Sequence, residues 1–320
     1  MFIMKKTVSL SMIMLLLLLC GCKADEVNNT QTRVLLDTVV KLTADCDEDT
    51  LSGAFDLCSQ YEDRLSRTKS GSDVFLLNGS GGAVTVSDCT VEIIEKSVYY
   101  SDLTNGLFDI TVCPVSELWD FKNQVIPSRD EIAEALKNVD YHSIEINGNS
   151  VNLNGKKIDL GGIAKGYIAD RVKEYLVENG ASSGIINLGG NVVVFGDKYK
   201  VGIQKPFSED LAATVELCDK SAVTSGVYQR YIEKDGEIYH HIIDPRTGYG
   251  VKSGLYSVTV LGDSSFDCDA LSTSCLLLGL DGGMSLIEKT PNTEAVFIDG
   301  NGKMYVSSGL YIKGKRIAYK

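Results

Sequence analysis

The C-terminal half of the chain consists of short β-branched segments separated by turns rich in glycine and asparagine. These segments predict strands at 184–194, 200–204, 214–217, 227–233, 238–243 and 255–261. One helical segment, 269–278, interrupts them. The strict alternation of strand and helix that a parallel dinucleotide-binding sheet requires is missing. We therefore expect an α+β fold with mostly antiparallel sheets and helices packed against them.

The N-terminal half carries segments whose periodicity and capping residues predict helices at 47–65, 91–103, 128–137 and 165–178. Ser128 and Glu131 have the spacing of a capping box, and Asn179-Gly180 is typical of a helix C-terminus. Alternation predicts a strand at 34–42, and asparagine-glycine turns predict hairpins at 144–158 and 295–305.

The N-terminus has the pattern of an export signal. Lys5 and Lys6 precede an apolar run at 8–19 that is too short to span a bilayer as a mature helix. The following Leu19-Cys20-Gly21-Cys22 resembles a bacterial lipobox. We expect a signal peptide at 1–21, a lipidated Cys22 with a polar tether at 22–31, and one domain at 32–320. An uncleaved anchor beside an ordinary cysteine pair is the alternative, and we expect no later membrane-spanning segment.

The charge of the chain restricts its partners. The formal net charge is −12 at pH 7. Proteins that bind the nucleic-acid backbone present clustered lysine and arginine instead. We therefore expect no nucleic-acid partner.

Two glycine-rich turns are candidate ligand sites. Asp159-Leu160-Gly161-Gly162 leads directly into the helix expected from Lys165, where free N–H groups and the helix dipole favour a phosphate. A tight strand-to-helix corner with no ligand explains that spacing equally well. The second turn, 187–191, is another place where backbone can approach a ligand closely.

Two further segments carry side chains suited to chemistry. His241 and Asp244 lie three apart at a strand end and are candidates for a proton acceptor and its orienting carboxylate, although a purely structural histidine is the simpler interpretation. Asp269 and Thr273 share one helix face, and this sparse set of oxygen ligands suits Mg²⁺. An N-cap aspartate beside a helix-facing threonine is the alternative.

Taken in order, these motifs closely resemble the ApbE family, the FAD:protein FMN transferases. The resemblance also includes Leu36 to Val40, the 108–112 segment, Ser225-Gly226 and Tyr228 to Arg230. It implies an ApbE-like, T-fold-like architecture in which the Ala164 carbonyl joins Asp269 and Thr273 as Mg²⁺ ligands. It also implies that FAD is held by residues matching Leu36, Asp109, Lys165, Tyr167 and Ile243. Trp119 is expected either to cover part of the flavin or to lie in the core.

The resemblance further implies the reaction and its place. FAD would be the substrate, and its FMN half would pass to a threonine or serine of an acceptor flavoprotein of a membrane electron-transfer system, releasing AMP. His241 would be the base, and Asp244 would orient it or bind the acceptor. The enzyme would be lipid-anchored on the extracytoplasmic face of the cell membrane. A Mg²⁺-dependent FAD pyrophosphatase and an FAD-binding lipoprotein remain as alternatives.

Overall fold

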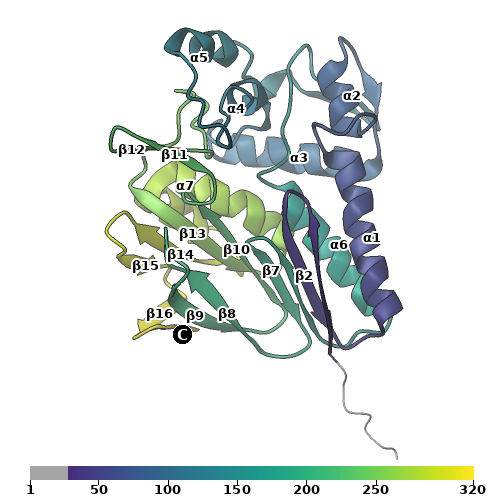
Figure 1. Ribbon diagram of the computed structural model, residues 1–320, viewed down its shortest axis with the longest axis vertical. Coiled ribbons are helices and arrows are strands. Elements are labelled where there is room, and N and C mark those ends of the chain that lie inside the picture. The colour runs from purple at the N-terminus through teal and green to yellow at the C-terminus, as the bar shows by residue number, and fades with distance from the viewer. Residues whose placement is uncertain (1–27) are drawn as a thin grey trace, which may run out of the picture.

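A large antiparallel sheet forms the centre of the protein, whose computed structural model describes residues 28–320 (Figure 1). Its strand order is β1-β2-β6-β7-β10-β13-β14-β15, and every neighbouring pair is antiparallel, as predicted. The strands are β1 (Asn29–Leu35), β2 (Thr38–Ala44), β6 (Gly184–Leu188), β7 (Asn191–Phe195), β10 (Lys220–Gly226), β13 (Leu255–Gly262), β14 (Glu294–Asp299) and β15 (Met304–Val306).

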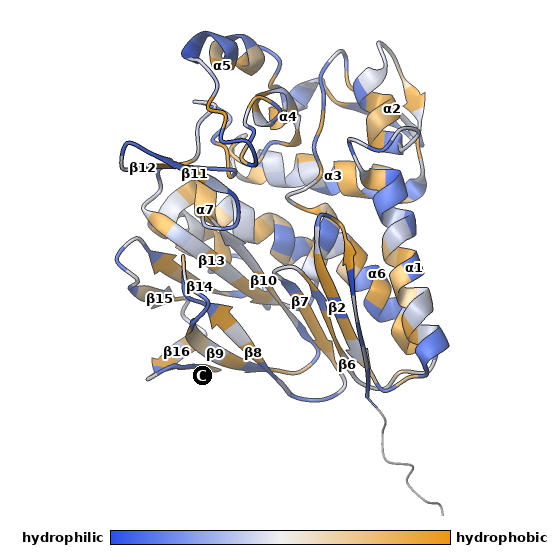
Figure 2. Ribbon diagram, in the orientation of Figure 1, coloured by the Kyte–Doolittle hydropathy of each residue, from blue (hydrophilic) through white to orange (hydrophobic). Residues whose placement is uncertain are grey.

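Helices cover one face of this sheet and a smaller sheet covers the other. On the helical face, α1 (Glu48–Leu65), α6 (Ala164–Glu178) and α7 (Ser265–Ile287) bury side chains such as Phe55, Leu176 and Leu271 against the strands. On the opposite face, apolar residues of the large sheet pack against the smaller sheet, whose order is β16-β17-β9-β8. Its strands are β8 (Tyr199–Gln204), β9 (Leu211–Leu217), β16 (Leu310–Lys313) and β17 (Arg316–Tyr319). Apolar residues therefore concentrate in the strands and in α7 (Figure 2).

The remaining elements lie at one end of the large sheet (Figure 1). They include a three-stranded sheet and a separate two-stranded hairpin. Their bounds are α2 (Asp73–Gly79), β3 (Val84–Thr85), α3 (Asp88–Leu103), η1 (Ile110–Val112), α4 (Cys113–Ser116), α5 (Arg129–Leu136), η2 (Tyr141–Ser143), β4 (Glu145–Asn147), β5 (Ser150–Asn152), β11 (Tyr231–Lys234) and β12 (Glu237–His240).

Local capping signals explain why the predicted helices form. The Asp47 carboxylate accepts the N–H of Thr50 at 2.7 Å and begins α1. Ser128 and Glu131 form the expected capping box at the start of α5. After α3, Asn105 and Gly106 both have positive φ, which ends the helix where the sequence predicted.

Helix α7 is apolar enough, and long enough, to span a membrane, contrary to our expectation that no later segment would be. Of the part of the chain that the structure describes, it is the one helix that meets this criterion, and 56% of its most apolar window is buried inside the protein. Its backbone is also broken at Gly279, where φ is 75°. The helix is apolar because it lies in the core between α6 and the sheet.

The first predicted strand is wrong in detail. Segment 34–42 is a hairpin, in which β1 and β2 are joined by Leu36 and Asp37, both with positive φ. The sheet also begins at Asn29, ahead of Thr32, because Asn29 pairs with Ala44. The expected signal peptide and Cys22 lie outside the described residues.

Other predicted elements needed smaller corrections. Segment 184–194 turns back at Gly189-Gly190 and forms the two strands β6 and β7. The strands expected at 227–233 and 238–243 are the short β11 and β12. Eight elements were not predicted at all: α2, β3, η1, α4, η2, β10, β16 and β17.

The Leu36-Asp37 turn leads to a stability prediction. Two successive left-handed residues form a type I′ hairpin turn, which glycine occupies without the steric cost that a Cβ brings. Asp37 is exposed, so Asp37→Gly should raise the free energy of unfolding by about 0.5–1 kcal/mol. Urea unfolding tests this, with Asp49→Gly in the first turn of α1 as the control that should lower stability. A lower midpoint for Asp37→Gly would contradict the strain argument.

Candidate active site

One cleft collects most of the predicted site residues. It has a volume of about 390 Å³ and lies where the β1–β2 turn, the 107–121 segment, the start of α6 and the first half of α7 meet. Among the residues proposed from the sequence, those lining it are Leu36, Asp109, Trp119, Ala164, Lys165, His241, Ile243, Asp269 and Thr273. Tyr167 and Asp244 do not line it.

The two helices at the cleft cap each other. Asp269 of α7 accepts the N–H of Gly166 in the first turn of α6 through Oδ2, at 2.8 Å. In return, Asp170 of α6 accepts the N–H groups of Ser265 and Phe266 at the start of α7, at 2.9 and 3.0 Å. This exchange fixes the start of α6, which has no side-chain cap of its own, against the start of α7.

Gly166 allows this close approach. A Cβ at this position would lie 2.3 Å from the carbonyl oxygen of Ser265 and 2.7 Å from the Cβ of Asp269. Any residue with a Cβ at position 166 would push the backbones of α6 and α7 apart, so their close packing requires glycine there.

Asp269 and Thr273 fit a hard cation. The Asp269 side chain is only 4% exposed, and burial raises the pKa of its carboxyl group although Lys165 and the Gly166 N–H oppose the shift. A buried carboxylate of this kind is stabilised by a bound cation. Thr273 Oγ1 lies 3.0 Å from Ser225 Oγ in the same cleft, and Ala164 also lines it. Within residues 28–320, no cluster of three or more His, Cys, Asp or Glu side chains forms a denser metal site.

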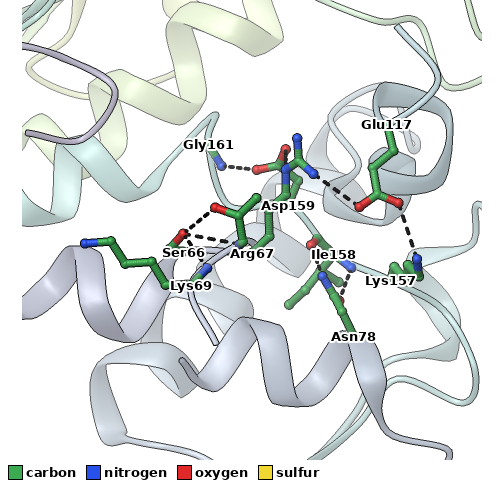
Figure 3. A network of polar contacts seen from close by, with 10 residues as sticks. Ser66, Arg67, Lys69, Asn78, Glu117, Lys157, Ile158, Asp159 and Gly161 are labelled. Atoms are coloured by element: carbon green, nitrogen blue, oxygen red, sulfur yellow. Dashed lines mark hydrogen bonds and ion pairs between the residues drawn. The ribbon is translucent and has the colours of Figure 1, made fainter. Parts of the chain in front are cut away.

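An ion-pair network anchors the glycine turn before α6 (Figure 3). The Arg67 guanidinium contacts Asp159 at 3.0 Å and Glu117 at 3.1 Å. Asp159 in turn accepts the N–H of Gly161 at 2.9 Å. Arg67 thus holds the turn through Asp159, and it lines the cleft together with Lys165 and Arg230. These cations and the start of α6 suit an anionic ligand even though the whole protein is acidic.

A glutamate side chain of α1 holds the β1–β2 turn at the cleft. Glu62 accepts the N–H of Leu36 at 3.0 Å and pairs with Lys69 at 2.8 Å. This contact stabilises a leucine in a left-handed conformation and places it at the cleft wall.

His241 presents one free ring nitrogen. Its Nδ1 lies 3.2 Å from the carbonyl oxygen of Arg230, and because a carbonyl only accepts, Nδ1 carries the proton of that hydrogen bond. Nε2 is then the nitrogen that can take a proton. Burial, together with the charge of Arg230, lowers the pKa of His241 to about 3, so the side chain is neutral at physiological pH.

The predicted role of Asp244 as the orienter of His241 is wrong. Both Asp244 carboxylate oxygens bind the Arg246 guanidinium, at 2.9 and 2.7 Å, and Oδ1 also accepts the Arg246 N–H. Both carboxylate oxygens are therefore bound within this Asx-type turn and do not contact His241. The Arg230 carbonyl is the group that orients His241.

The low pKa of His241 predicts how stability depends on pH. In the unfolded chain the imidazole titrates near 6.5, whereas the folded protein resists protonation down to about 3. As the pH falls from 6.5 towards 3, the imidazole takes up a proton in the unfolded chain but stays neutral in the folded protein. The contribution of His241 to the unfolding free energy is therefore fully present above pH 6.5 and declines below it. His241→Gln should therefore lose less unfolding free energy than the wild type between neutral pH and about pH 5. Urea unfolding across this range tests the prediction; the exposed His142→Gln is the control, and equal losses in wild type and His241→Gln would contradict it.

The side chain of Tyr167 does not reach the ligand space. It is 4% exposed and packs edge-on against Tyr61 and Phe266, with Arg171 over its ring. Tyr167 lies on the face of α6 that packs against α1 and α7, so its ring is buried in the core. A direct flavin contact by this side chain was therefore a wrong expectation.

Trp119 is a core residue at the cleft wall. It is 5% exposed, its indole N–H donates to the Gly248 carbonyl at 3.1 Å, and Tyr239 stacks on it. This geometry matches the core alternative stated for it. Asp109 lines the cleft but uses one oxygen to cap η1 through Thr111, and Ile243 is likewise buried at the wall.

Sequence reasoning missed several groups around the cleft. No local sequence pattern marks Arg67 or Glu62 as site residues, because their partners Asp159 and Leu36 lie far away in the sequence. Asn191 is 2% exposed and its amide lowers the pKa of Asp269; it was noted only as part of a glycine turn. Asp170 was equally hidden, although its place one helical turn after Gly166 would have suggested the same helix face.

The cleft therefore combines the features of an enzyme site for a phosphate-containing ligand: a helix start, lining cations, a buried carboxylate and a neutral histidine. The chain belongs to the ApbE family, whose model matches residues 36–297. It is 34% identical over 272 residues to an FAD:protein FMN transferase of Klebsiella pneumoniae (strain 342), which covers 82% of this chain and 86% of that protein.

Solved structures agree with this assignment. The crystal structure of the ApbE protein from Thermotoga maritima matches with a TM-score of 0.82 and 29% identity, covering 88% of this chain and 97% of that one. The flavin transferase ApbE from Vibrio cholerae matches with a TM-score of 0.79 and 25% identity, covering 88% and 97%. The ApbE-like α+β fold expected from the sequence is thereby confirmed.

Proposed function

We propose that this protein is a Mg²⁺-dependent FAD:protein FMN transferase, which moves the FMN half of FAD onto a threonine or serine hydroxyl of an extracytoplasmic flavoprotein. One observation carries the proposal: Asp269, Thr273 and the start of α6 open on the same cleft as the free nitrogen of His241. The family assignment supports transfer of FMN from FAD to protein. The metal and the class of acceptor are our own additions.

The proposed reaction forms one phosphorus–oxygen bond and breaks another. The acceptor hydroxyl oxygen attacks the phosphorus next to riboflavin, the bond from that phosphorus to the bridging oxygen breaks, and AMP leaves with the bridging oxygen. The hydroxyl proton passes to Nε2 of His241. General-base assistance contributes roughly 10²–10⁴-fold to the rate when the pKa of the base lies near the operating pH. The pKa of His241 is about 3 without a ligand, so the proposal requires that the negative charge of the bound pyrophosphate raises it.

The other cleft residues position the pyrophosphate. Lys165 would bind its oxygens through its ammonium group and its backbone N–H, since the neighbouring N–H groups of Ala164 and Gly166 donate to Leu160 and Asp269. Arg67 keeps the glycine turn in place through Asp159. Asp269, Thr273 and the Ala164 carbonyl would hold magnesium, which when bound neutralises charge on the pyrophosphate and the leaving group.

The proposal includes a membrane location. The lipobox ending in Cys22 supports lipid attachment on the extracytoplasmic side, and the polar segment after it would act as a tether. Acceptors would then be flavoproteins of membrane electron-transfer systems, within reach of that anchor.

A product assay tests the proposed function. The full-length protein in detergent is incubated with FAD and Mg²⁺, with and without a candidate acceptor flavoprotein. We expect acceptor carrying one FMN together with an equal amount of AMP, and no product after EDTA treatment. Free FMN and AMP in both reactions would instead identify an FAD pyrophosphatase, and unchanged FAD would identify an FAD-binding lipoprotein.

A further inference from the structure

Three hydroxyl groups form a hydrogen-bonded chain behind the proposed metal site. Thr273 Oγ1 lies 3.0 Å from Ser225 Oγ. Ser225 Oγ lies 2.8 Å from Ser272 Oγ, and the Ser272 hydroxyl donates to the backbone carbonyl of Asp269 at 3.0 Å. The hydroxyl chain therefore begins at one proposed Mg²⁺ ligand, crosses from α7 to β10, and returns to the backbone of the other ligand.

The hydroxyl chain runs from the cleft into the core. Thr273 and Ser225 line the cleft, whereas Ser272 does not. Ser272 is fully buried, and Ser225 is only 9% exposed. Buried hydroxyl groups depend on protein partners for their hydrogen bonds, so the proton of Ser272 has to be donated inside the protein.

One direction of donation satisfies all three contacts. A carbonyl oxygen only accepts, so the single proton of Ser272 lies on the Asp269 carbonyl, and Ser225 must donate to Ser272. The proton of Ser225 is then used, so Thr273 must donate to Ser225. With the opposite direction, the contact to the Asp269 carbonyl would have no proton. The Thr273 hydroxyl would then also have no acceptor among residues 28–320.

This direction leaves the oxygen of Thr273 available as a ligand. Its one proton is bound to Ser225, so the remaining lone pairs of Thr273 Oγ1 are free at the cleft. Mg²⁺ binds oxygen lone pairs, and a hydroxyl proton directed at the cation would oppose binding.

We infer that Ser225 is a positioning residue, which holds the hydroxyl of Thr273 so that its lone pairs remain available to magnesium, and that Ser272 holds Ser225 in the same way. The inference rests on the proposed function, because it needs the proposed Mg²⁺ site at Asp269 and Thr273. It gives the metal site two uncharged supporting residues, one of which lies outside the cleft.

Two serines on β10 provide a matched pair of variants. Ser225→Ala removes the acceptor of the Thr273 proton. Ser221 is also buried on β10, but its hydroxyl has no hydrogen-bond partner in the described part of the chain, so Ser221→Ala is the control. Ser272→Ala is a second test, because it removes the acceptor of the Ser225 proton without altering a residue of the cleft lining.

The measurement is the FAD affinity of the full-length protein in detergent as a function of Mg²⁺ concentration, read from flavin fluorescence without an acceptor protein. We expect the half-saturating Mg²⁺ concentration to rise about tenfold in Ser225→Ala, by a smaller factor in Ser272→Ala, and not at all in Ser221→Ala. Excess Mg²⁺ should restore wild-type FAD affinity, because every direct ligand is still present. Adding Ser272→Ala to Ser225→Ala should have no further effect, because the hydroxyl chain is already broken.

Three results would overturn the inference alone. They are a wild-type Mg²⁺ requirement in Ser225→Ala or Ser272→Ala, a loss of FAD affinity that excess Mg²⁺ does not restore, and additive effects of the two substitutions. If Ser225→Ala does not fold, Ser272→Ala decides the matter. A wild-type protein that binds FAD equally well with and without Mg²⁺ would instead contradict the proposed metal site, and the inference would fail with it.

Discussion

Asp269→Asn is expected to lower kcat/KM for FMN transfer on the order of 10³-fold or more, because the proposed magnesium site loses its only charged ligand. The same change should raise the free energy of unfolding of the metal-free protein, since the carboxylate is buried and burial raises its pKa. Added Mg²⁺ should raise the melting temperature of the wild type and leave that of the variant unchanged. Transfer assays and thermal unfolding with and without Mg²⁺ measure all three effects.

Asp267→Asn is the matched control on the same helix. The Asp267 carboxylate binds Lys96 at 2.7 Å and the Tyr100 hydroxyl at 2.6 Å, and Asp267 does not line the cleft. This variant should lose stability and keep transfer, the reverse of Asp269→Asn. An Asp269→Asn enzyme with near wild-type transfer would contradict the assignment of the metal site.

Gly166→Ala is expected to damage both stability and activity. The added methyl group would meet backbone atoms of Ser265, which cannot rotate away as a side chain can, so α6 and α7 must separate. We expect a loss of about 2–3 kcal/mol in unfolding free energy. Displacement of the start of α6 by about 1 Å should cost a further factor of about 10² in transfer.

Gly79→Ala separates this effect from a general intolerance of alanine. Gly79 closes α2, and a Cβ there would meet nothing within 4 Å. Its substitution should be neutral or slightly stabilising. Urea unfolding and transfer assays of both variants test the argument, and a Gly166→Ala protein as stable as Gly79→Ala would show that the helices have room that the structure does not indicate.

Local signals in the sequence explain what could be predicted. Asp47 and Ser128 cap helices through residues three positions away, so the helices could be assigned from short windows. Asp269 and Thr273 are likewise one helical turn apart, and both line the cleft. The mostly antiparallel pairing followed from turns between short strands, whereas the order of the strands was not predicted.

What could not be predicted depends on contacts between distant segments. Asp170 and Asp269 cap each other's helices across about a hundred residues of sequence, and no local pattern reveals this exchange. The Leu36-Asp37 turn escaped prediction because leucine is a poor residue for positive φ, and the turn depends on the N–H contact with Glu62. Asp244 has a suitable spacing from His241, but its carboxylate binds Arg246, which is nearer to it in the sequence.

An isotope experiment tests the central claim most directly. Wild-type protein, FAD, Mg²⁺ and an acceptor flavoprotein are incubated in water that carries the heavy oxygen isotope, and AMP and flavinylated acceptor are analysed by mass spectrometry. Direct attack by the acceptor hydroxyl predicts one FMN per labelled site and no heavy oxygen in either product. Heavy oxygen in AMP, or FMN that appears only in solution and carries the heavy isotope, would show that water is the nucleophile and would contradict transfer to protein.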